Sequence, residues 1–129
     1  MAEPRLRAVL CDDDATVRRV VAGLAEDCGF EVVGEAALAL EALVLAEMTK
    51  AHVLVLDLSL RGMSGNDVIP AVRTAAPGTE IVVYTAFDTL ARLAEEAGVV
   101  DVVRKEEPGK LEEVLRRVAA NHGHYVMHP

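Results

Sequence analysis

The chain has 129 residues, which is enough for one domain with one hydrophobic core, and 52% of them are apolar, so a disordered chain is excluded. Acidic residues outnumber basic ones by 21 to 13, and the net charge of −8 argues against nucleic-acid binding by this chain, because phosphate contacts need clustered Lys and Arg. No apolar run approaches membrane-spanning length and no signal core follows Met1, so we expect a cytoplasmic protein without a membrane partner.

Strand-like apolar runs alternate with helical periodicity along the whole chain. A first strand is predicted over residues 6–11, and apolar residues then recur at helical spacing from Val17 to Cys28, with Asp14 as a candidate helix cap. Further strands are predicted over residues 30–35, 51–57, 80–85 and 99–104. Further helices are predicted over residues 36–50, from about 66 to 76, over 88–97, and from Pro108 onward.

Five apolar strands that alternate with five helices favour an α/β fold with a parallel sheet covered on both faces. Right-handed crossovers then limit the topology to a few doubly wound forms. We expect one domain over residues 1–121 and a short C-terminal tail over residues 122–129. Cys11 and Cys28 both fall on apolar faces, so we expect two buried free thiols rather than a disulfide.

Chemically useful residues stand where four of these strands end. The first strand ends in Asp12 and Asp13, the third in Asp57, the fourth in Thr85, and the fifth in Lys105. In a parallel sheet these strand ends share one rim, where α/β proteins bind their ligands. Clustered carboxylates repel one another unless a cation such as Mg²⁺ joins them, and an aspartate can itself accept a phosphoryl group. The pattern therefore indicates metal-assisted phosphoryl transfer to Asp57.

This pattern resembles the receiver domain of two-component response regulators over most of the chain. The matching stretches are VLCDDD at residues 9–14, VLD at 55–57 with Gly65 after it, VYTA at 83–86, and RK at 104–105. The resemblance implies a flavodoxin-like (βα)5 fold, a doubly wound five-stranded parallel sheet with the strand order 2-1-3-4-5.

The resemblance also implies a role for each residue of the site. Asp57 would be the phosphoacceptor, served by a sensor histidine kinase, a phosphotransfer protein or a small acyl phosphate, and Thr85 and Lys105 would contact the phosphoryl group. The ligands of Mg²⁺ would be Asp12, Asp13, Asp57 and the backbone carbonyl of Ser59. The signal would pass to a downstream protein or to an output domain that follows this chain. Such a protein is not an enzyme beyond its own phosphorylation and dephosphorylation.

Three positions depart from the usual receiver pattern. Glu106 stands where a proline usually follows the lysine. Val102 stands where an aromatic residue is usual, three residues before that lysine. Arg61 stands where a proline is usual, four residues after the phosphoacceptor. The first two changes flank Lys105 on the signalling side of the fold. We therefore expect phosphorylation to proceed while its readout differs from that of ordinary receivers.

Two other functions fit parts of the sequence. The stretch DDDATV at residues 12–17 also resembles the first motif of haloacid-dehalogenase-like phosphatases, in which Asp12 would be the nucleophile and Asp14 the general acid. Alternatively, the chain is a receiver-like docking module that is never phosphorylated. Asp57 separates the receiver from the phosphatase, because a receiver requires it and the phosphatase does not. A gain of phosphate mass separates the receiver from the docking module.

Overall fold

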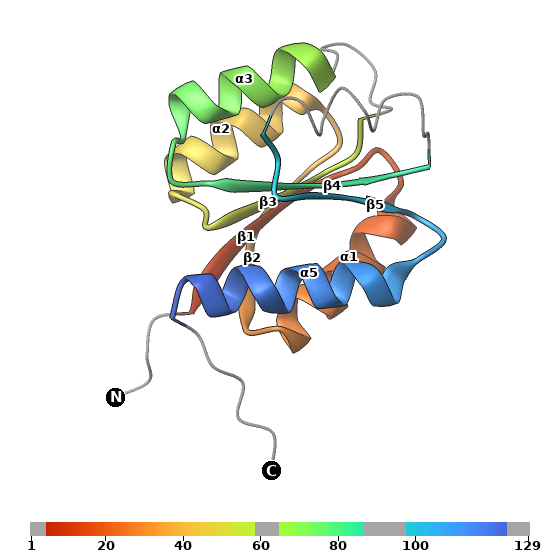
Figure 1. The fold of residues 1–129 in the computed structure, drawn as a ribbon. Helices are drawn as coiled ribbons and strands as arrows, with labels where there is room; N and C mark the ends of the chain where they lie inside the picture. Colours follow the sequence, from red (N-terminus) through yellow and green to blue (C-terminus); the bar gives the residue numbers. More distant parts are fainter. Residues whose placement is uncertain (1–4, 59–64, 87–97, 124–129) are drawn as a thin grey trace.

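A parallel sheet runs through the middle of the molecule, and helices cover both of its faces (Figure 1). The computed structural model describes residues 5–58, 65–86 and 98–123. The strands are β1 (Leu6–Cys11), β2 (Phe30–Ala36), β3 (Val53–Leu56), β4 (Glu80–Thr85) and β5 (Asp101–Arg104). The described helices are α1 (Ala15–Asp27), α2 (Ala39–Thr49), α3 (Gly65–Ala75) and α5 (Pro108–Asn121). The helix predicted over residues 88–97 lies outside the described residues.

The sheet has the strand order β2-β1-β3-β4-β5, and all four strand pairs are parallel. The predicted flavodoxin-like topology is therefore confirmed. Strand pairing also sets the site, because Cys11 of β1 pairs with Leu56 of β3. The next residue on each strand is an aspartate, so Asp12 and Asp57 leave the sheet side by side.

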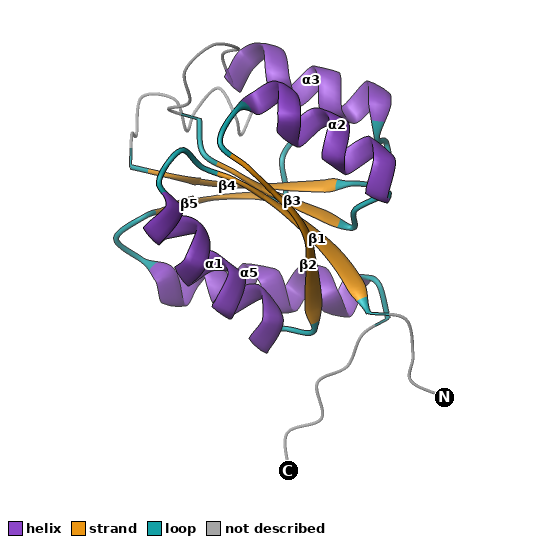
Figure 2. Ribbon diagram, turned by 180° about the vertical axis from the view of Figure 1, so that it is seen from behind, coloured by secondary structure: helices purple, strands orange, loops and turns teal. Residues whose placement is uncertain are grey.

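Each face of the sheet has its own helix layer and its own core. Helices α2 and α3 lie on one face, and α1 and α5 lie on the other (Figure 2). Because side chains alternate along a strand, Leu54 faces α2 and α3, whereas Val53 and Val55 face α1 and α5. Both faces of β3 are thus buried, which explains why its sequence is a continuous apolar run.

Local sequence accounts for most element boundaries, and pairing between strands sets the others. Asp14 caps α1 as predicted, because its carboxylate accepts hydrogen bonds from the amides of Thr16 and Val17. Ala36 was expected to begin a helix, but it pairs with Cys11 as the last residue of β2, and α2 begins only at Ala39. None of the helices in the described ranges has both the length and the apolar character needed to cross a bilayer.

Candidate functional site

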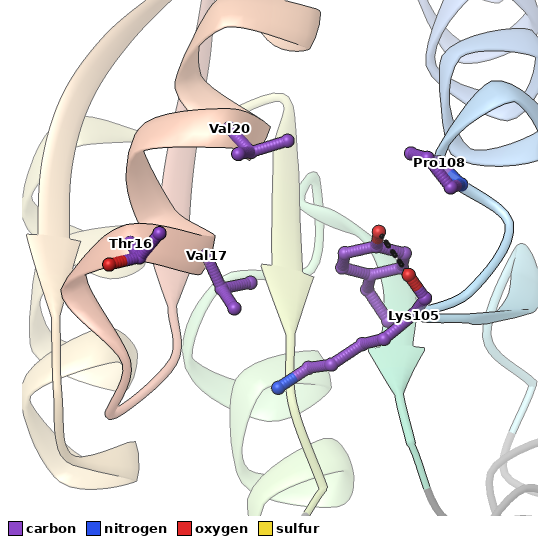
Figure 3. A pocket seen from close by; sticks show the side chains of 6 residues that line it. Thr16, Val17, Val20, Lys105 and Pro108 are labelled. Atoms are coloured by element: carbon purple, nitrogen blue, oxygen red, sulfur yellow. Dashed lines mark hydrogen bonds between the residues drawn. The ribbon is translucent and has the colours of Figure 1, made fainter.

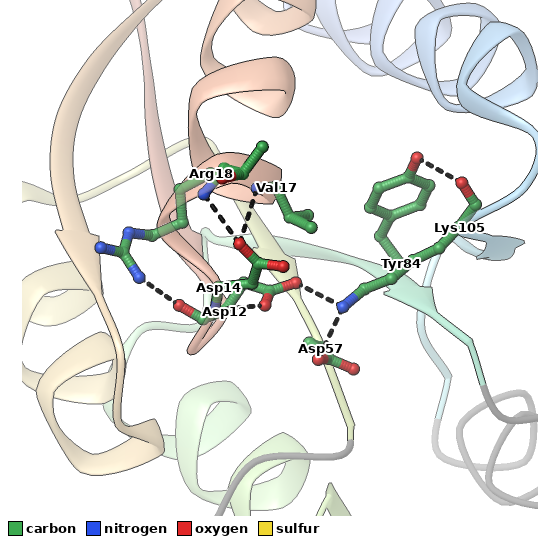
Figure 4. A network of polar contacts seen from close by, with 8 residues as sticks. Asp12, Asp14, Val17, Arg18, Asp57, Tyr84 and Lys105 are labelled. Atoms are coloured by element: carbon green, nitrogen blue, oxygen red, sulfur yellow. Dashed lines mark hydrogen bonds and ion pairs between the residues drawn. The ribbon is translucent and has the colours of Figure 1, made fainter.

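Asp12 and Asp57 form the buried base of the site. Their side chains are close together on the rim formed by the ends of β1 and β3 (Figure 4). The residues are 5% and 2% exposed, respectively. Their backbones are anchored in the sheet, since the Asp57 amide donates to the Cys11 carbonyl at 3.0 Å and the Asp12 amide donates to the Ala36 carbonyl at 3.0 Å. The two carboxylates are therefore held in place by the strands that precede them.

Asp13 adds a third carboxylate, and it is exposed to solvent. Asp12, Asp13 and Asp57 each offer a ligand atom, and these atoms all lie within 4.8 Å of one another. Oxygen ligands gathered in this way suit a hard divalent cation, and Mg²⁺ commonly uses one or two carboxylates together with water. The described residues thus fit the predicted Mg²⁺ site. Ser59, whose backbone carbonyl was expected to join them, lies outside the described residues.

Lys105 joins the two buried carboxylates. Its ammonium lies 2.7 Å from Asp12 Oδ2 and 3.0 Å from Asp57 Oδ2 (Figure 4). Burial alone would lower the pKa of Lys105, but the hydrogen bonds to Asp12 and Asp57 outweigh it and the pKa is raised. The ammonium therefore stays charged between the two carboxylates.

Burial has the largest influence on the pKa of Asp12. Burial raises the pKa of Asp12, while the hydrogen bonds from Lys105 and from the Asp14 amide oppose that rise. The Asp14 amide donates to Asp12 Oδ1 at 2.9 Å. A cation bound at this rim would favour the charged form of the same carboxylate.

Thr85 ends β4 and is 1% exposed. Its carbonyl accepts a hydrogen bond from the Lys105 amide at 3.0 Å, so it lies on the rim that carries Lys105. The structure thus brings Asp12, Asp13, Asp57 and Lys105 together, with Thr85 at the adjoining strand end. Asp14 is used differently, because its carboxylate caps α1 rather than joining this group.

Two residues of the site were missed by sequence reasoning. The Arg18 guanidinium on α1 donates to the Asp12 carbonyl and forms an ion pair with Glu35 at 3.3 Å. The Tyr84 hydroxyl donates to the Lys105 carbonyl at 3.0 Å. The Arg18–Glu35 and Tyr84–Lys105 contacts join segments that only the folded sheet brings together, so the spacing of these residues does not indicate them.

Both cysteines, Cys11 and Cys28, are free and buried, as predicted. Burial raises the pKa of Cys11 to about 12 and that of Cys28 to about 11. Both thiols are therefore protonated at neutral pH and serve as small core side chains.

This chain is similar to proteins of the response regulator family. A family model described as the response regulator receiver domain matches residues 8–118. The nitrate/nitrite response regulator protein homolog of Haemophilus influenzae is 29% identical over 121 residues, which cover 91% of this chain and 58% of that protein. Chemotaxis protein CheY of Thermotoga maritima is 28% identical over 116 residues, which cover 88% of this chain and 97% of that protein.

The fold of this chain also matches solved structures of response regulators. The REC domain of AraT, a response regulator from Geobacillus stearothermophilus, superposes with a TM-score of 0.83 at 29% identity, covering 93% of this chain and 97% of that one. The chain therefore spans nearly all of some relatives and little more than half of the Haemophilus influenzae protein.

Proposed function

The chain belongs to the response regulator receiver domain family, and from that membership we propose that it accepts a phosphoryl group on Asp57 in two-component signal transduction. One observation carries the proposal: the carboxylates of Asp12, Asp13 and Asp57 gather within 4.8 Å, and the Lys105 ammonium contacts two of them. Receiver domains are signalling domains rather than classical enzymes, so any catalysis here is the chain's own phosphorylation and dephosphorylation.

In the proposed reaction, a carboxylate oxygen of Asp57 forms a bond to phosphorus while the bond between phosphorus and the donor's leaving group breaks. Lys105 is 3.0 Å from Asp57 and would pair with the phosphoryl oxygens as they arrive. The Thr85 hydroxyl would donate a hydrogen bond to the same group. Asp12 and Asp13 would hold Mg²⁺ together with Asp57 and the Ser59 carbonyl. When bound, the ion would offset the negative charge of the carboxylates and the phosphoryl oxygens.

The partners follow from this chemistry. We propose that a sensor histidine kinase or a phosphotransfer protein donates the phosphoryl group. The signal would then pass to a downstream protein or to a C-terminal output domain. We also propose that residues 1–121 form the receiver unit and residues 122–129 a tail, that the protein is cytoplasmic, and that this chain does not itself bind nucleic acid.

Intact mass after incubation with Mg²⁺ and acetyl phosphate tests the proposal. We expect the parent protein to gain the mass of one phosphoryl group and Asp57→Asn to gain none. Asp14→Asn is the matched control, because Asp14 follows Asp12 and Asp13 in the loop after β1 but caps α1, and this variant should still gain the mass. Addition of a chelator of divalent ions should slow the reaction of the parent.

Other outcomes would contradict the proposal in different ways. An adduct that survives Asp57→Asn but is lost in Asp12→Asn would identify Asp12 as the nucleophile and favour the phosphatase. Absence of an adduct from both acetyl phosphate and phosphorylated histidine kinases would favour a docking module that is never phosphorylated.

A further inference from the structure

Two consecutive residues of β4 hold the backbone of Lys105. The Lys105 amide donates to the Thr85 carbonyl at 3.0 Å, and the Tyr84 hydroxyl donates to the Lys105 carbonyl at 3.0 Å. The pairing of β4 with β5 ends at Thr85 and Arg104, so Lys105 is the first residue beyond the strand ladder. The Lys105 carbonyl therefore lies beyond the strand pairing, and the Tyr84 hydroxyl supplies its hydrogen bond.

Packing fixes the Tyr84 ring that supplies this hydrogen bond. Tyr84 is 5% exposed, and it lines a hollow with Val17 and Val20 of α1 and with Pro108 at the start of α5 (Figure 3). The ring also belongs to the core cluster between the sheet and helices α1 and α5, and this packing limits where its hydroxyl can lie. A buried tyrosine hydroxyl usually finds a hydrogen-bond partner, and here that partner is the Lys105 carbonyl.

The position of the Lys105 backbone matters because the lysine side chain is long and flexible. Its ammonium reaches Asp12 at 2.7 Å and Asp57 at 3.0 Å at one end, while Tyr84 holds the carbonyl at the other end (Figure 4). The residue after Lys105 is Glu106, which lacks the fixed φ of proline, so its ring-free backbone does not restrict the chain next to Lys105. Small displacements of a positioned group can cost a large part of its effect on a reaction.

We propose that Tyr84 is a positioning residue for Lys105: its hydroxyl fixes the Lys105 carbonyl, and the ammonium is thereby held on Asp12 and Asp57. Tyr84 does not touch the reacting atoms and acts only through Lys105. The consequence for phosphoryl transfer rests on the function proposed for Asp57, whereas the effect on the lysine itself does not.

Tyr84→Phe in the full chain tests this proposal, because it keeps the ring and removes only the hydroxyl. NMR relaxation of the Lys105 side chain, measured without a phosphoryl donor, should show a less ordered ammonium end. The rate of adduct formation with Mg²⁺ and acetyl phosphate should fall about five- to tenfold, the effect expected for one lost hydrogen bond. Val82→Ala is the control, because Val82 is buried in the same core cluster as Tyr84 and offers Lys105 no polar group.

The control should lower stability while leaving the Lys105 relaxation and the rate near those of the parent. The proposal is wrong if Tyr84→Phe changes neither measurement, or if Val82→Ala changes both to the same extent. If Lys105 loosens in Tyr84→Phe but the parent itself takes no phosphoryl group, then the positioning role is supported and the function proposed for Asp57 fails.

Discussion

Charge balance around a single lysine dominates the site at the scale of residues. The Lys105 ammonium contacts Asp12 and Asp57, both buried, and a carboxylate oxygen of Asp13 lies within 4.8 Å of theirs. Fully ionised, the three carboxylates exceed the one ammonium by two charges. Buried charges are costly unless they are paired, so the excess favours binding of a divalent cation. Burial, and to a lesser extent the neighbouring Asp57 carboxylate, raises the pKa of Asp12 despite its contact with Lys105.

The buried thiol of Cys28 makes stability depend on pH in the alkaline range. Burial raises the pKa of Cys28 from 9.0 to about 11, so the unfolded chain loses this proton first as the pH rises. The free energy of unfolding should therefore be unaffected below pH 9 and should fall between pH 9 and 11. Between pH 8.5 and 10.5 we expect the parent to lose roughly 1 to 2 kcal/mol more than Cys28→Ala.

Urea unfolding under reducing conditions at the two pH values measures this difference. The cost of the cavity left by alanine is the same at both pH values, and the other titrating groups are common to both proteins, so they cancel. Equal losses in the parent and in Cys28→Ala would contradict the prediction.

At the scale of elements, β5 carries Val102 and leads directly into Lys105. The strand has four residues, lies at the edge of the sheet and pairs only with β4 among the described strands. Val102 pairs with Val83 and packs half-buried against the core shared by α2 and α3. A β-branched side chain has a restricted χ1 and no ring that could swing between two positions. Under the proposed function, Val102 thus favours a readout that does not depend on a side-chain flip at this strand.

We therefore predict that a phosphoryl mimic changes the surroundings of Asp57 without changing the rotamer of Val102. Crystal structures with and without beryllofluoride and Mg²⁺ measure this directly. If Thr85 and the segment at residues 88–97 instead moved as they do in ordinary receivers, the expectation of an unusual readout would be wrong. The Asp57→Asn variant under the same conditions is the control, because it should not respond to the mimic.

At the scale of the whole molecule, one sheet separates two cores but also couples them. Leu54 is fully buried on the face covered by α2 and α3, and Leu115 of α5 is fully buried on the other face. Both cores share the same five strands, so neither face can open without exposing the backbone of the sheet. We infer that the described part of the chain unfolds as one cooperative unit.

This architecture predicts that matched core variants on opposite faces behave alike. Leu54→Ala and Leu115→Ala should each lower the free energy of unfolding by about 3 kcal/mol, while the far-UV circular dichroism and tyrosine fluorescence transitions stay coincident in urea. Leu40→Ala on the exposed side of α2 is the control, because Leu40 is 59% exposed, and it should change stability by less than about 0.5 kcal/mol. Separate transitions for the two probes would contradict a single cooperative unit.

Within the described residues, the sequence by itself determined the element types, their order and the strand ends that carry Asp12, Asp57, Thr85 and Lys105. These features are local, because apolar periodicity distinguishes strands from helices and parallel strands bring their carboxyl ends to one rim. The boundary at Ala36 could not be read in this way, because it depends on pairing with Cys11 in another strand.

Only the tertiary structure decided how the rim residues meet. It buries Asp12 and exposes Asp13, places the Lys105 ammonium on two carboxylates, and joins the Tyr84 hydroxyl to the Lys105 carbonyl. The physical reason is register: β1 and β3 must align Cys11 with Leu56, and β4 and β5 must align Thr85 with Arg104. These alignments join residues far apart in the chain, and no local pattern of residues specifies them.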